Sequence, residues 1–201
     1  MVRLCGSLIL ATSFLFAAQS SQAAILVYTA DLSGPNEAPP NASPGTGFAE
    51  VDIDTLLHTM TIDITFSGLL GNTTASHIHS ATLVAGTGTA GVATTTPTFP
   101  GFPLGVTSGS YLQTFDLTLT SSYNPSYVTA NGGTAAGAET ALLAGLAAGK
   151  AYLNIHSNLF PGGEIRGFLV PVPEPSSILL LGAGIVGMTV YGRRRIVSRH
   201  G

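Results

Sequence analysis

Two neighbouring segments decide the fold: residues 47–54 read GFAEVDID, and residues 59–66 read TMTIDITF. In the second segment apolar and polar residues alternate strictly, and in the first apolar Phe48, Val51 and Ile53 stand among acidic residues. Successive side chains of a strand point to opposite faces, so a period of two predicts strands with one buried and one solvated face. Because the two segments are separated by a short turn, we expect them to form an antiparallel hairpin.

Further segments rich in Val, Ile, Thr and aromatic residues end at Gly or Pro, which indicates more short strands. The apolar phase slips once near Thr114, which predicts a β-bulge there. We therefore expect an all-β fold, an antiparallel Greek-key sandwich or flattened barrel with one short helix. The expected elements are strands at 25–32, 75–83, 111–120, 151–155 and 164–170, a helix at 138–148, and an irregular surface loop at 85–105.

Residues 1–23 have the layout of a secretory signal peptide. Met1-Val2-Arg3 is a short basic start, an apolar stretch follows, and Ser21-Gln22-Ala23 has the small residues of a cleavage site. We expect export by the secretion translocon and cleavage after Ala23. The one cysteine of the chain, Cys5, leaves with this peptide. The exported domain is therefore expected to lack disulfides and cysteine metal sites.

The expected domain, residues 24–171, has an acidic balance with few charges. Lys150 and Arg166 are its only Lys or Arg, against nine Asp and Glu, which gives a net charge of −7. Two cations cannot neutralise a run of phosphates, so this composition excludes nucleic acid as a partner. About 150 residues are enough for one domain with its own core.

The end of the chain has the layout of a membrane signal. Pro173-Glu174-Pro175 precede an apolar stretch, for which we expect a transmembrane helix at 177–192, and Arg193-Arg194-Arg195 follow. An Arg at the bilayer centre is costly, so the three arginines are expected to stop transfer on the cytoplasmic side and to leave 196–201 as a cytoplasmic tail.

This order of parts, from residue 172 to residue 195, resembles the PEP-CTERM sorting signal of Gram-negative bacteria. The resemblance implies an exosortase-type processing enzyme as a partner. It also implies insertion in the inner membrane through the C-terminal helix, followed by release to the periplasm, the cell surface or the extracellular space.

Three histidines form the one cluster whose pattern indicates chemistry. His77 and His79 are two residues apart on an expected strand, so they point to the same face. His156 belongs to a separate expected strand, where Tyr152 and Asn154 share its face. If these strands meet, three neutral imidazoles suit copper or zinc. The alternative, which is commoner for strand histidines, is a hydrogen-bonded ladder without metal.

No catalytic constellation accompanies the histidines in the sequence. The chain contains no G-x-S-x-G elbow, and no pair of carboxylates is singled out by spacing. Glu164 and Arg166 are two residues apart on one expected strand and are candidates for a structural ion pair. We therefore expect the protein not to be an enzyme.

Four motifs resemble the landmarks of the CHRD domain family, in the family's order. They are LSGPNEAPP at 32–40, SHIH at 76–79, GKAYLNIHS at 149–157 and PGGEIRG at 161–167. The resemblance covers about residues 25–169 and implies a β-sandwich, unlike that of immunoglobulins, with no established enzymatic activity. Together with the two sorting signals, it implies an exported cell-envelope or extracellular-matrix module with a binding or structural role, for which extracellular polysaccharide is a candidate partner.

A weaker similarity is to the Cu/Zn superoxide dismutases, which also carry a His-x-His pair on a Greek-key strand. It implies a copper-ligand role for His77, His79 and His156. The long loop with the zinc ligands and the bridging histidine is not recognisable in this chain, and the disulfide cannot form without cysteines. The alternative function is therefore a copper- or zinc-binding protein with a three-histidine site.

Overall fold

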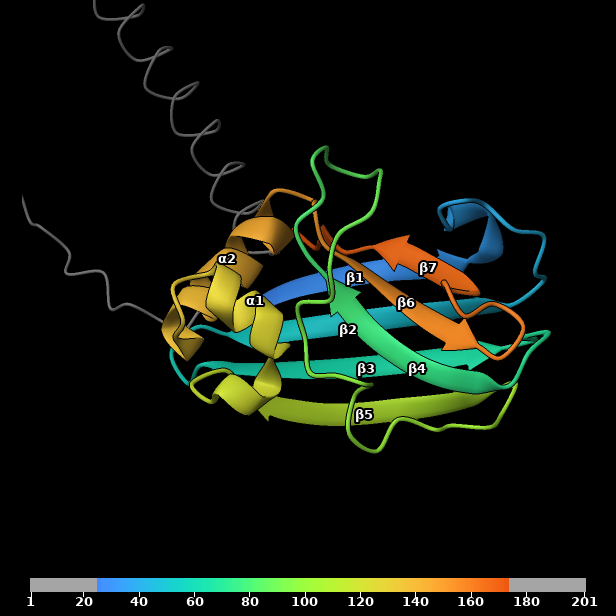
Figure 1. Ribbon diagram of the computed structural model, residues 1–201, viewed down its shortest axis with the longest axis horizontal. Coiled ribbons are helices and arrows are strands. Elements are labelled where there is room, and N and C mark those ends of the chain that lie inside the picture. The colour runs from blue at the N-terminus through green and yellow to red at the C-terminus, as the bar shows by residue number, and fades with distance from the viewer. Residues whose placement is uncertain (1–24, 174–201) are drawn as a thin grey trace, which may run out of the picture.

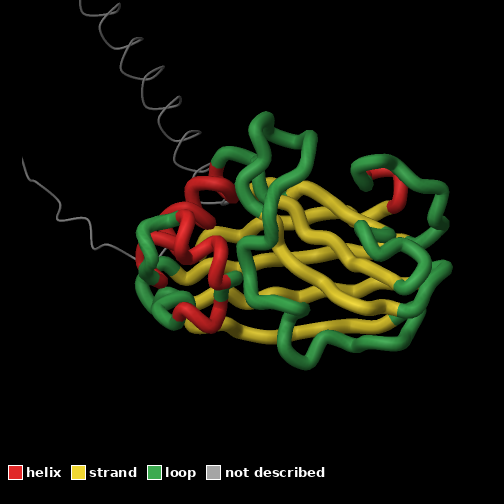
Figure 2. The backbone as a smooth tube through the Cα atoms, in the orientation of Figure 1, coloured by secondary structure: helices red, strands yellow, loops and turns green. Residues whose placement is uncertain are grey.

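The computed structural model describes residues 25–173, so the expected signal peptide and transmembrane helix lie outside the described residues. Strands dominate this part of the chain, and the two α-helices gather at one end of it (Figures 1 and 2). No helix among the described residues is long and apolar enough to cross a membrane. The elements are β1 (Ile25–Ser33), β2 (Thr46–Asp54), β3 (Thr59–Ser67), β4 (Thr73–His79), β5 (Gly109–Asp116), α1 (Pro125–Ala130), α2 (Ala135–Ala147), β6 (Tyr152–Ser157), β7 (Ile165–Phe168) and β8 (Val170–Pro171), with 3-10 helices at Gly34–Asn36 and Thr120–Ser122.

All the strands belong to one antiparallel sheet. Its order is β4-β6-β7-β1-β2-β3-β5, and β8 pairs with β1. The sheet curls so that β4 and β6 cross over β1, β2 and β3 (Figure 1), which makes a half-barrel. The all-β antiparallel prediction is confirmed. In place of the expected sandwich or flattened barrel, the described chain forms a single sheet that curls without closing, and two α-helices stand where one was expected.

The β2–β3 hairpin follows the predicted register and lines the core. The strands pair from Thr46 opposite Ser67 to Asp54 opposite Thr59, and every second side chain is buried. Phe48 is an exception to the expected phase, because it lies on the solvent face and is 43% exposed. The small Ala49 takes the buried position instead. The larger apolar side chain of the two is therefore not the one that faces the core.

The loop between β4 and β5 is packed into the protein rather than lying on its surface. Phe99 and Phe102, from the expected surface loop, are buried in the core, where both rings pack against Tyr111. The loop also follows β4, since the amide of Ala93 donates to the Ile78 carbonyl. Figure 2 shows this loop crossing the front of the sheet. Its high Gly and Pro content predicted irregular backbone correctly but did not reveal that the backbone covers β4.

The predicted bulge near Thr114 is wrong. β5 pairs with β3 in one continuous register, and Leu112 faces solvent with 68% exposure. The apparent change of phase arises because Leu112 is an apolar residue on the solvent face of the strand. The register shift that the sheet does contain lies between Thr73 and Ala75, where β4 pairs with β6.

Candidate metal centre

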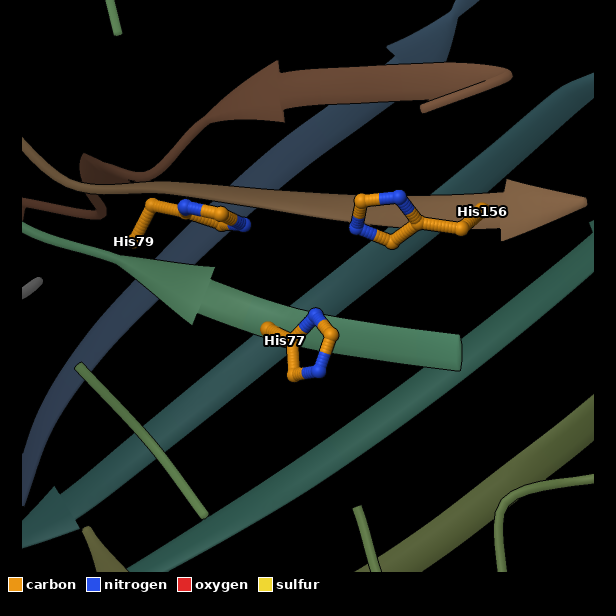
Figure 3. A group of neighbouring side chains, drawn as sticks. All are labelled: His77, His79 and His156. Carbon is orange, nitrogen blue, oxygen red and sulfur yellow. The ribbon is translucent and has the colours of Figure 1, made fainter. Parts of the chain in front are cut away.

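β4 and β6 bring the three histidines together. The two strands pair antiparallel, with His77 opposite Asn154 and His79 opposite Tyr152. One ligand atom from each of His77, His79 and His156 lies within 4.8 Å of the other two. Figure 3 shows the three rings gathered over this strand pair. The structure thus places side by side all three histidines that the sequence pattern selected.

Each imidazole is held by a backbone carbonyl from a loop. Because a carbonyl oxygen only accepts hydrogen bonds, the ring nitrogen that faces it must carry the proton. This fixes one tautomer for each ring and leaves the lone pair on the other nitrogen. The three bonds are His77 Nε2 to the Pro97 carbonyl at 2.6 Å, His79 Nδ1 to the Ala90 carbonyl at 2.9 Å and His156 Nδ1 to the Pro161 carbonyl at 2.9 Å.

The second nitrogen of each ring is buried and has no hydrogen-bond partner. These atoms are Nδ1 of His77, Nε2 of His79 and Nε2 of His156. A buried polar atom without a partner is costly, and three of them in one cluster need an explanation. A hydrogen-bonded ladder of histidines would satisfy these nitrogens within the cluster, whereas a metal ion would satisfy all three lone pairs at once.

Burial also keeps the three rings uncharged. Desolvation lowers the pKa of His77 to about 4, and the neighbouring His156 and His79 rings lower it further while the bond to Pro97 opposes them. Burial likewise lowers the pKa of His79 and of His156. Since only the neutral imidazole can coordinate a metal, the cluster is in a ligating form at neutral pH.

A stacked layer supports His79 from one side. The Tyr152 ring lies parallel to the His79 ring, with centroids 4.7 Å apart and an interplanar angle of 5°. The Arg166 guanidinium lies 4.5 Å from the centroid of the Tyr152 ring. Arg166 is itself fixed, because its Nε donates to the Asn36 carbonyl at 2.7 Å and its Nη1 donates to the Gly88 carbonyl at 3.1 Å. The histidine cluster is therefore supported by two side chains, Tyr152 and Arg166, that do not belong to its ligand set.

Arg166 has a different acidic partner from the predicted one. Its Nε lies 3.9 Å from Oε2 of Glu37, and both side chains are buried. Burial raises the pKa of Glu37, while the Arg166 charge opposes that rise. Glu164 precedes β7 and accepts hydrogen bonds from Ser43 Oγ at 2.7 Å and from the backbone amides of residues 70 and 71. The two candidates are thus both structural, but in separate interactions.

The sorting residues lie at and beyond the end of the described chain. Pro173 is exposed and follows Val172, whose amide donates to the Val27 carbonyl of β1 beyond the end of β8. Glu174, Pro175 and the three arginines Arg193, Arg194 and Arg195 lie outside the described residues.

Comparison with known families identifies two segments of the chain. A CHRD domain matches residues 28–169, and a PEP-CTERM protein-sorting motif matches residues 171–195. No curated protein and no solved structure matches the chain. The sorting motif fits an exported protein that is processed by an exosortase-type enzyme. Because the first match covers most of the 201 residues, the chain belongs to the CHRD domain family.

Proposed function

We propose that this protein is an exported module of the cell envelope or extracellular matrix whose CHRD domain binds one copper or zinc ion through His77, His79 and His156. The observation that carries the proposal is the set of three buried imidazole nitrogens without partners. Each belongs to a ring whose other nitrogen is held by a backbone carbonyl. This is the arrangement by which proteins orient histidine ligands toward a metal.

The donor set favours a borderline transition metal. Three imidazoles suit copper and zinc, whereas calcium and magnesium require oxygen ligands. Nitrogens bound to one tetrahedral zinc lie about 3.3 Å apart, given Zn–N bonds of about 2.0 Å. Side-chain rotation can bring ligand atoms that lie within 4.8 Å of one another to this separation. Three protein ligands leave a fourth position for water or another small ligand.

We propose binding rather than catalysis for this centre. The cluster of converging ligand atoms consists of histidines alone among the described residues, so no carboxylate within it can act as a general base. Arg166, which lies over the Tyr152 ring, is paired with Glu37. A structural or storage role for the ion fits this arrangement. The protein would then be an envelope module that carries a metal ion, rather than one without a metal.

Metal analysis of the purified domain tests the proposal. We expect one copper or zinc ion per chain after dialysis against a buffer that contains trace amounts of both metals at neutral pH. Elemental analysis by mass spectrometry gives the stoichiometry, and competition with a chromophoric chelator gives the affinity. A domain that is folded by circular dichroism and remains free of metal under these conditions would contradict the metal-binding function.

Replacement of Pro173, Glu174 and Pro175 by alanine tests the sorting assignment. In the native host we expect the variant to accumulate as a full-length, membrane-associated chain, because the exosortase-type enzyme no longer recognises it. Immunoblots of membrane and extracellular fractions separate the full-length from the shortened form. Processing of the variant at the wild-type rate would refute the assignment, whatever the metal content of the domain.

A further inference from the structure

The last strand of the domain runs directly into the sorting motif. In β8, Val170 lies opposite Thr29 and Pro171 lies opposite Tyr28 on β1. The amide of Val172 donates to the Val27 carbonyl at 2.8 Å. The next residue is Pro173, the first of the Pro-Glu-Pro motif. The chain is therefore fastened to β1 until the residue before the motif, with no spacer between them.

The attachment of β8 to β1 is short, with two residue pairs and one further backbone hydrogen bond. β7 lies between β6 and β1, whereas β8 has β1 as its one strand neighbour within the described chain. Val170 is 53% exposed and Val172 is 43% exposed, so both side chains of the segment are already partly in solvent. Pro171 has no amide hydrogen to contribute to a ladder. A terminal strand with few bonds and exposed side chains opens far more readily than the core strands.

The surface that β8 covers is apolar and small. A cavity of about 140 Å³ lies between the start of β1 and the end of the described chain, lined by Ile25–Tyr28 and Pro171–Pro173. Ile25 is 51% exposed beside it. Because β1 and β8 are antiparallel, the beginning of the domain and its connection to the sorting motif lie at the same end. A processing enzyme must reach the motif next to this end of the folded domain.

An enzyme that cleaves a peptide chain binds it in an extended form, often by adding it as a strand to its own sheet edge or cleft. While β8 is paired, the segment before Pro173 already has β1 as its partner. We propose that Val170–Val172 separate from β1 when the exosortase-type enzyme engages the chain, and that this release frees an extended segment before Pro173 for the enzyme to hold.

This inference rests on the sorting part of the proposed function and is independent of the metal. It assigns a conformational step to residues 170–172, which directly precede Pro173 and of which residues 171 and 172 fall within the matched sorting motif. The other possibility is that the enzyme reads the motif while β8 stays paired. The rate of processing distinguishes these two possibilities. A chain whose β8 cannot leave β1 is processed slowly only if release of β8 is required.

A disulfide between Thr29 and Val170 tests the proposal. Directly opposite residues of antiparallel strands have Cα atoms about 5.5 Å apart, within the range that disulfides span. The chain contains a single cysteine, Cys5, far from this pair in the sequence. In the full-length Thr29→Cys/Val170→Cys double variant, expressed in the native host, we expect the oxidised chain to be processed at least tenfold more slowly than wild type. The two single-cysteine variants and the reduced double variant should be processed normally.

A second change distinguishes strand release from misfolding. Insertion of six Gly and Ser residues between Val172 and Pro173 should restore processing of the oxidised double variant, because the enzyme then has an extended segment without opening β8. Wild-type processing of the oxidised chain without the insertion would overturn the proposal, and so would failure of the insertion to rescue processing. If the Pro-Glu-Pro to alanine chain were processed like wild type, the sorting assignment itself would fail instead.

Discussion

Replacement of His77 by alanine is expected to abolish stoichiometric metal binding and to lower the affinity for copper or zinc by at least about 100-fold. Loss of a residue that merely orients a ligand typically lowers metal affinity about 10- to 100-fold, and loss of a ligand has a larger effect. His77 contributes one of the three unpartnered nitrogens, so its removal leaves a site with two protein ligands. The same result is expected for His79→Ala and His156→Ala.

The effect should also appear in thermal stability. An ion that binds the folded state and not the unfolded state stabilises the domain by about 4 kcal/mol when the free ion concentration is 1,000 times Kd. We therefore expect the melting temperature of the wild type, and not of His77→Ala, to fall when a chelator is added. Differential scanning calorimetry with and without chelator measures both.

His58→Ala provides the matched control for these experiments. Its ring lies outside the cluster, with Nδ1 2.8 Å from Oε1 of Glu139, and the side chain is 49% exposed. The variant loses an imidazole without a change to the three clustered histidines. It should therefore keep one ion per chain, and its melting temperature should still fall when a chelator is added. A His77→Ala domain that still holds one ion, or a His58→Ala domain that loses it, would contradict the three-histidine centre.

The histidine cluster was predictable because strand geometry is local. Residues at i and i+2 of a strand share a face, so the spacing of His77 and His79 is enough to indicate a common direction. The pairing of β4 with β6, which adds His156, was a condition of that prediction and is present in the structure. The carbonyls of Pro97, Ala90 and Pro161 were not predictable, since any residue offers a carbonyl and the loop path decides which one is near.

The larger differences between expectation and structure have the same origin. Gly and Pro in residues 85–105 indicated irregular backbone, but only the packing of Phe99 and Phe102 against the open side of the half-barrel shows that this loop belongs to the core. Similarly, alternation predicted the strands around Phe48 and Leu112 and could not assign these two residues to the solvent face. The curling of the sheet decides which loop is buried and which strand face meets solvent. It depends on contacts between residues far apart in the sequence, which leave no periodic signal.

Metal affinity is expected to fall less between pH 7 and pH 5 than it does for a metal bound by solvated histidines. Protons compete with the metal for the same imidazole lone pairs, so affinity falls only where the ligands of the folded, metal-free protein become protonated. Burial lowers the pKa of His77 to about 4 and also lowers the pKa of His79 and of His156. Each ring therefore remains available to the metal below the ordinary histidine pKa of about 6.5. The loss of affinity on acidification should therefore begin at a lower pH than for solvated histidines.

An exposed histidine pair gives the contrasting result and serves as the control. A peptide with the Ser76-His77-Ile78-His79 sequence has two solvated rings. With a pKa of about 6.5 for each ring, proton competition weakens metal binding by two histidines roughly 600-fold between pH 7 and pH 5. Competition titrations at several pH values, with the fold verified by circular dichroism at each, compare the domain with the peptide. A domain that loses affinity as steeply as the peptide would mean that its ligands titrate like solvated histidines, and the buried, carbonyl-held cage could not be what binds the ion.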